Sequence, residues 1–96
     1  MAGVRDIKEW ARSFEEYLAY RLRRSQNTVM SYASDLDQYL TFAAKHNLDP
    51  LELSTLDLWI TELSKNNIRG TSINRKISAL RTFGEYLVYD GKLNQN

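Results

Sequence analysis

The chain of 96 residues, 43% of them hydrophobic and with a formal net charge of +1, has the size of one small globular domain. It contains no cysteine, which excludes a disulfide framework, a thiolate zinc site and a cysteine nucleophile. Its single histidine, His46, cannot build a metal site alone, so we expect no metal site and no cofactor. No apolar run approaches the ~18 residues of a membrane span, and the start of the chain has no signal-type stretch, so we expect a cytoplasmic protein without membrane contact.

The first predicted element covers about residues 4–22. Its apolar residues recur with the 3.6-residue period of a helix, not with the 2.0-residue period of a strand. They are Ile7, Trp10, Ala11, Phe14, Tyr17, Leu18 and Leu22. The pattern predicts an amphipathic helix.

A second helix is predicted to start after residues 24–27 and to continue to about residue 43. Ser25 or Asn27 can accept hydrogen bonds from the free amides of its first turn. One side is apolar, and the opposite side is polar but uncharged, which suits close approach to a partner. The apolar residues include Val29, Tyr32, Ala33, Leu36, Tyr39, Leu40 and Ala43, and the polar ones are Asn27, Ser31, Ser34 and Gln38.

The third helix follows a connection at residues 47–50, where Pro50, the only proline, disfavours helical geometry at Asp49. Ser54 stands three residues before Asp57, a spacing that resembles a capping box and predicts the start of the helix. We expect the helix to end within residues 66–70. Its apolar side consists of Leu56, Trp59, Ile60 and Leu63.

The fourth helix is predicted from about Thr71 to Tyr89, with Gly91 in the left-handed closing position. Lys76 lies only ~60° from the centre of its apolar side, so its stem is expected to run beside the core. No segment alternates like a strand, so the predicted fold class is all-α, a bundle of four helices. A helical wheel places Ile73, Ile77, Leu80, Gly84 and Leu87 on one side, and Thr71, Arg75, Ser78 and Thr82 on the other.

The charges are separated along the chain. Residues 65–81 hold five cations and no acid, whereas residues 35–62 hold six acids and one cation. This asymmetry indicates an anion-binding side, although a solvated charged face would give the same pattern. The five cations are Lys65, Arg69, Arg75, Lys76 and Arg81.

Two clusters, residues 21–31 and 69–81, lie across the starts of the second and fourth helices. Free amides and the positive end of a helix dipole favour anions there, so neighbouring hydroxyls, amides and cations can bind phosphates. For Ser25 and Thr71, capping alone explains the residue equally well. The candidate DNA-binding residues are Arg24, Ser25, Asn27, Thr28, Ser31, Arg69, Thr71, Ser72, Asn74, Arg75, Lys76, Ser78 and Arg81.

The sequence offers no candidate catalytic residues. It has no Gly-rich phosphate loop and no cluster of metal ligands, and His46 lies in a polar turn where we expect it to be exposed. Tyrosines at apolar helical positions, Tyr17, Tyr32, Tyr39 and Tyr86, are expected to pack with satisfied hydroxyls rather than to react.

Residues 25–36 (SQNTVMSYASDL) and 71–83 (TSINRKISALRTF) closely resemble the amino-terminal core-binding domain of tyrosine recombinases of the phage-integrase and Xer type. Residues 14–18 (FEEYL), 53–58 (LSTLDL) and 86–91 (YLVYDG) resemble that family's first helix, the entry to its third helix and its closing stretch. The resemblance covers almost the whole chain, with the segments in the same order and at the same spacing.

The resemblance implies a SAM-like bundle over residues 1–92, followed at residues 93–96 by the start of a linker to a catalytic domain. Such a domain forms half of a clamp around double-stranded DNA at a recombination site, with its second and fourth helices near the major groove. It also implies contact with its own catalytic domain and with neighbouring protomers in a synaptic tetramer. The domain alone is expected to catalyse nothing. The alternative is a small helical protein-interaction module with a basic docking face.

Overall fold

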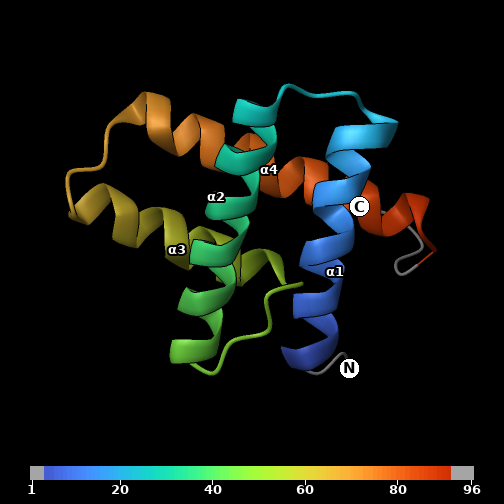
Figure 1. Cartoon of the computed structure of the whole chain (residues 1–96). Coiled ribbons are helices and arrows are strands. Elements are labelled where there is room, and N and C mark those ends of the chain that lie inside the picture. The colour runs from blue at the N-terminus through green and yellow to red at the C-terminus, as the bar shows by residue number, and fades with distance from the viewer. Residues whose placement is uncertain (1–3, 92–96) are drawn as a thin grey trace.

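The computed structural model describes the backbone of residues 4–91 and the side chains of residues 9–91, and within that range it contains four α-helices, one π-helical turn and no strand (Figure 1). The predicted all-α, four-helix fold is therefore confirmed. The expected linker at residues 93–96 lies outside the described range. The elements are α1 (Val4–Glu16), the π-helical turn η1 (Tyr17–Arg21), α2 (Gln26–Lys45), α3 (Leu53–Lys65) and α4 (Gly70–Tyr89).

The helices form two crossed pairs. Figure 1 shows α1 and α2 running antiparallel in front of α3 and α4, which are also antiparallel to each other. Helix α2 packs against the other three, and its packing with α4 is the most extensive. The side of α2 that faces α4 therefore determines which residues of the two helices can meet.

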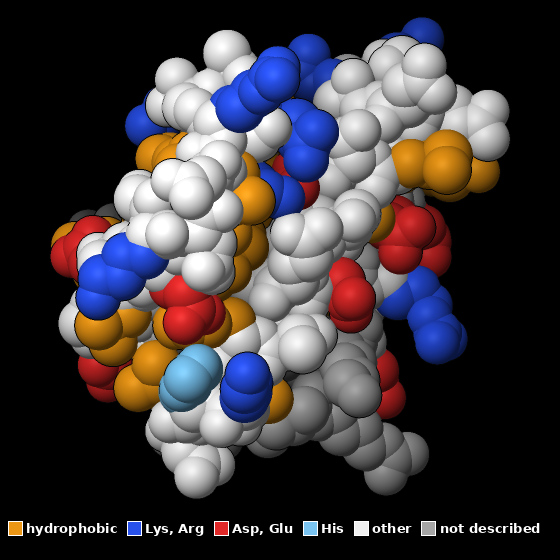
Figure 2. All heavy atoms as spheres, turned by 90° about the vertical axis from the view of Figure 1, so that its left-hand side faces the viewer, with side chains coloured by type: hydrophobic (Ala, Val, Ile, Leu, Met, Phe, Trp, Pro, Cys, Tyr) orange, Lys and Arg blue, Asp and Glu red, His pale blue; other side chains and the backbone are white. Residues whose placement is uncertain are grey.

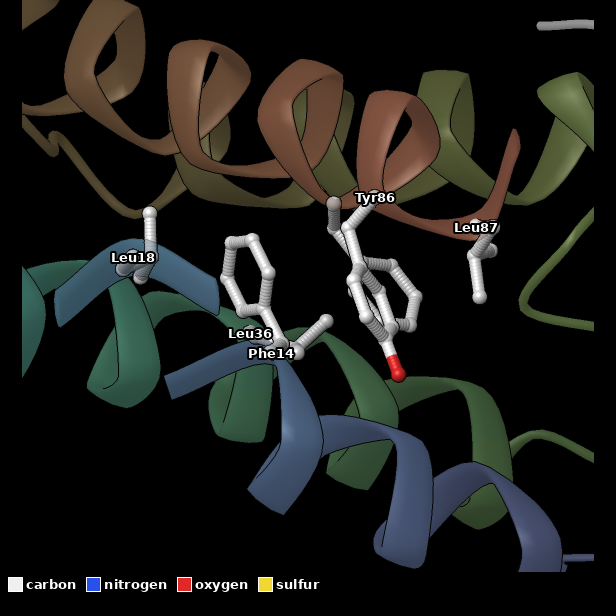
Figure 3. Close-up of a cluster of buried hydrophobic side chains, with 6 residues drawn as sticks. Phe14, Leu18, Leu36, Tyr86 and Leu87 are labelled. Carbon is white, nitrogen blue, oxygen red and sulfur yellow. The ribbon is translucent and has the colours of Figure 1, made fainter. Parts of the chain in front are cut away.

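The core forms where α1, α2 and α4 meet. Phe14 and Leu18 point from α1 and η1 towards Tyr86 and Leu87 of α4, with Leu36 of α2 beside them (Figure 3). These five side chains are buried, as the apolar periodicity predicts. Aromatic rings fill much of the space: Phe14 meets Phe83 edge to face at 5.3 Å and Tyr86 at 6.0 Å between ring centroids.

Helix α3 is attached to α2 through a second aromatic contact. The rings of Tyr39 and Trp59 lie 5.2 Å apart, and both side chains are buried. The Tyr39 hydroxyl donates to the Pro50 carbonyl oxygen at 2.7 Å, so the expected satisfied tyrosine is found. Burial, and secondarily the charge of Asp49, raises the pKa of Tyr39 to about 12.

The prediction that Ser54 caps the start of the third helix was wrong. Helix α3 begins at Leu53, so Ser54 lies inside it, and the N-cap residue, Glu52, makes no side-chain cap hydrogen bond. The buried Thr55 hydroxyl instead donates to the Asp49 carbonyl oxygen at 2.7 Å, and an Asp49 carboxylate oxygen accepts from the Leu51 amide at 2.9 Å. These two hydrogen bonds fix the turn around the proline and connect it to α3 through Thr55, but neither satisfies a free amide of the first turn of α3.

The other helix ends follow the predictions more closely. Ser25 is the N-cap of α2, and its Oγ accepts from the Thr28 amide at 3.1 Å. Helix α4 begins at Gly70, so Thr71 lies within its first turn and does not cap it. Gly91 has a φ of 76°, which confirms the left-handed closing position.

Candidate nucleic-acid interface

The starts of α2 and α4 lie at the same end of the molecule, the upper end in Figure 1, together with the connection between η1 and α2. Figure 2 shows Lys and Arg side chains gathered over the upper part of one face, whereas most Asp and Glu side chains lie lower. The charge asymmetry of the sequence is therefore also an asymmetry in space. Amides at helix starts and cations at one end favour a polyanion there.

Most of the predicted DNA-binding residues are accessible. One of them, Lys76, is buried in the contact between α2 and α4. Exposed members are Arg24, Ser25, Asn27, Arg69, Thr71, Asn74, Arg75 and Arg81, and half-buried members are Thr28, Ser31, Ser72 and Ser78.

Arg75 lies on the side of α4 that carries no acid, but it contacts an acid from another helix. The guanidinium Nε and Nη2 donate to the two carboxylate oxygens of Asp35 at 2.9 and 2.7 Å. Asp35 comes from α2 and is fully buried, whereas the Arg75 side chain stays 45% exposed. The hydrogen bonds to Asp35 raise the pKa of Arg75 above its ordinary value. A helical wheel of α4 alone could not show a partner from α2.

Lys76 is the second cation bound to the same carboxylate. Its ammonium donates to Asp35 Oδ1 at 2.8 Å and to Gln38 Oε1 at 2.9 Å, and Gln38 in turn donates to Ser34 Oγ at 3.3 Å. The Lys76 side chain is only 7% exposed. The polar side of α2 is thus used partly to bind α4, and Lys76 holds the two helices together. We call Asp35, Arg75 and Lys76 the Asp35 trio.

The remaining cations of the basic stretch are arranged differently. Lys65, Arg69 and Arg81 are exposed, and no ion pair joins them to another residue within the described range. They are therefore available to solvent anions. Their side chains also keep the rotamer freedom that a bound partner would have to restrict.

Arginines in the connection between η1 and α2 extend the basic end. Arg23, which the sequence analysis did not single out, is exposed and has a left-handed φ of 54°. Arg21 lies over the Tyr89 ring at 5.1 Å from its centroid. The four-residue run from 21 to 24 contains three arginines, and that local density was the signal for Arg23.

Other site types find no support in the described part of the chain. No group of three His, Cys, Asp or Glu residues there could hold a metal ion. His46 is exposed, as expected, and its ring lies 4.6 Å from that of Phe42. None of the described helices is long and apolar enough to span a membrane.

Comparison with known proteins agrees with the all-α, four-helix fold. The chain belongs to the family described as the phage integrase N-terminal SAM-like domain, whose model matches residues 11–91. This confirms the resemblance found in the sequence. No solved structure matches the chain.

Its curated relatives are tyrosine recombinases. The chain is 32% identical over 90 residues to the tyrosine recombinase XerD of Rickettsia bellii, and the matched region covers 92% of this chain and 30% of that relative. It is 36% identical over 77 residues to XerD of Rickettsia conorii, and this match covers 78% of the chain and 25% of that relative. It is 37% identical over 82 residues to the tyrosine recombinase XerC of Lacticaseibacillus casei, and this match covers 78% of the chain and 26% of that relative. The chain thus spans about a quarter to a third of these relatives.

Proposed function

We propose that this chain is the DNA-binding amino-terminal domain of a site-specific tyrosine recombinase. In this proposal it forms half of a clamp around double-stranded DNA at a recombination site, and a separate catalytic domain forms the other half and performs the chemistry. Its further partners are that domain and neighbouring recombinase protomers. The observation that carries the proposal is the gathering of helix starts, hydroxyls and exposed arginines at one end of the fold.

The proposed contacts divide into two kinds. Residues at the helix starts, Arg24, Asn27, Thr28, Arg69 and Thr71, bind phosphates together with backbone amides. Residues further along α4, Arg75, Ser78 and Arg81, face the major groove, while Ser25, Ser31, Ser72 and Asn74 line the approach between the two sets. Lys76 contributes through the Asp35 trio, because its ammonium is buried.

Exposed cations that form no ion pair with residues 9–91 give the clearest test. Arg69→Ala and Arg81→Ala each remove one charge without leaving a buried partner unpaired. Lys45→Ala is the matched control, because Lys45 is exposed at the opposite end of α2. Binding to a fluorescent DNA duplex is measured by anisotropy between about 50 and 200 mM salt, where dissociation constants of about 10⁻⁴ to 10⁻⁶ M are expected.

Each arginine variant is expected to lower the slope of log K against log salt by about 0.9, and K45A to leave it unchanged. Amide shifts in a nitrogen-proton NMR titration should fall on residues near 24–34 and 69–82. No duplex binding at 50 mM salt, or equal losses in all three variants, would refute the proposal. Such a result would favour the alternative of a protein-interaction module.

A further inference from the structure

The Asp35 trio divides the donors of Arg75 into two sets. A guanidinium group has five N–H donors in a planar fork. Asp35 takes the side edge, formed by Nε and Nη2. The outer edge, formed by Nη1 and the second hydrogen of Nη2, makes no hydrogen bond to another described residue, and the side chain is 45% exposed. That edge has the geometry to bind a phosphate or the O6 and N7 atoms of guanine.

Lys76 makes this arrangement electrostatically possible. A buried carboxylate that paired with Arg75 alone would cancel its charge towards an approaching anion. Lys76 donates to the same carboxylate from the buried side, so the trio has a net charge of +1, which resides beside the exposed outer edge. The charge that a duplex meets at this point is therefore positive even though an acid lies beneath it.

Orientation is the second consequence. A free arginine side chain loses up to about 2 kcal/mol of rotamer entropy when it is fixed. Two hydrogen bonds to a fully buried group fix the Arg75 guanidinium before any ligand arrives. Arg69 and Arg81 have no such support within the described range.

We propose that Asp35 is a positioning residue for duplex binding, which acts by holding the outer edge of Arg75 towards the DNA. This inference rests on the proposed function. It makes a prediction opposite to that of simple charge counting. Removing an acid from a DNA-binding surface should strengthen binding, whereas removing Asp35 should weaken it, because Arg75 loses its anchor.

Two variants of Asp35 test the inference. Asp35→Asn removes the carboxylate charge but keeps the shape of the side chain. The double variant Asp35→Asn, Lys76→Met also removes the buried ammonium, so the trio keeps its net charge of +1 on Arg75 alone. Affinity differences between this double variant and the wild type therefore cannot come from net charge. The double variant also serves if the single one does not fold, because no unpaired buried lysine remains.

Asp37→Asn is the matched control, since Asp37 is an exposed acid two residues away on the same helix. Duplex affinities are measured across salt concentrations, with the folded fraction of each variant determined by circular dichroism. We expect both Asp35 variants to bind about fivefold or more weakly and to lose about 0.9 from the salt slope. We expect D37N to bind at least as tightly as the wild type. Partial unfolding would lower the affinity but leave the slope unchanged.

Arg75→Ala completes the test. If Asp35 acts through Arg75, then adding D35N to R75A has no further effect on affinity. Wild-type affinity and slope in the charge-matched double variant, or a further loss from D35N in the R75A background, would overturn the positioning role. A wild-type chain that does not bind the duplex at 50 mM salt would instead overturn the proposed function, and the positioning role with it.

Discussion

The members of the Asp35 trio should differ sharply in how much they contribute to folding stability. In D35N, the Lys76 ammonium stays buried without a counter-charge and has only neutral acceptors, the Gln38 amide oxygen and the amide oxygen introduced at position 35. Removing one partner of a buried ion pair typically costs about 3 to 5 kcal/mol, because the remaining charge is uncompensated. In K76M, Asp35 keeps both hydrogen bonds from Arg75, and the new side chain fills a similar volume. We expect that variant to lose about 1 kcal/mol or less, because Asp35 keeps Arg75 as its counter-charge and no buried charge is left uncompensated.

Urea unfolding at pH 7, followed by tryptophan fluorescence and circular dichroism, measures the difference. For an m-value of about 1.5 kcal/mol/M, D35N should lower the midpoint by about 2 M or more and K76M by less than about 1 M. The D35N/K76M double variant should be more stable than D35N alone, because the second change removes the unpaired charge. Equal costs for D35N and K76M, within about 0.5 kcal/mol, would refute the reasoning, as would a double variant less stable than D35N.

Three further predictions concern the ends of the helices and the loop before α3. Y39F removes the hydrogen bond to Pro50 and should cost about 1 kcal/mol of folding stability at pH 7. The pKa of Tyr39 is about 12 in the folded state and 10.0 in the unfolded state. The neutral hydroxyl therefore stabilises the fold fully below pH 10, and this contribution is lost between pH 10 and 12. Urea titrations at pH 9 and pH 12 should therefore show the gap between wild type and Y39F shrinking, and a constant gap would contradict this. S25A removes the N-cap of α2 and should cost about 1 kcal/mol in the same assay, while S25D should retain most of the stability. At Gly70 and Gly91 an added Cβ would meet nothing within 4 Å, so substitution by alanine tests the backbone conformation alone. In thermal melts, G70A at the start of α4 should gain about 0.4 to 1 kcal/mol of stability, whereas G91A, at a φ of 76°, should lose about 1 kcal/mol. Melting temperatures that shift in the same direction in both variants would argue against this explanation.

The four helices could be predicted from the sequence because their apolar residues repeat every 3.6 positions over long segments. The π-helical turn could not. The Leu22 amide donates to the Tyr17 carbonyl oxygen at 3.0 Å, five residues back, so the end of the first helix is one residue wider than an α-helical turn. A single wide turn rotates the positions of the following apolar residues around the helix axis, but by less than the width of the helix's apolar side. Periodicity therefore predicts one continuous helix through it.

The candidate site was predictable as a list of residues but not as an arrangement. The pairing of Asp35 with Arg75 joins residues forty positions apart, and it depends on which side of α2 meets α4. The sequence did contain one signal. Asp35 lies directly before Leu36, within a stripe that includes Tyr32 and Tyr39, and an acid in a buried register needs a buried cation. The binding roles themselves stay predictions.

Two physical kinds of arginine lie in the basic stretch of the described residues, and the proposed clamp uses both. Arg69 and Arg81, which are exposed and form no ion pair with another described residue, attract any polyanion, with an affinity that falls steeply as salt rises. Arg75, which Asp35 holds, keeps a net charge of +1 through Lys76 and also presents its donors in one orientation, which is the requirement for reading a base edge. Because the net charge is only +1, attraction of a duplex depends on the cations gathered at one end of the fold. Under the proposed function, discrimination between DNA sequences should therefore depend on Arg75 more than on Arg69 and Arg81, even where the three contribute equally to the salt dependence.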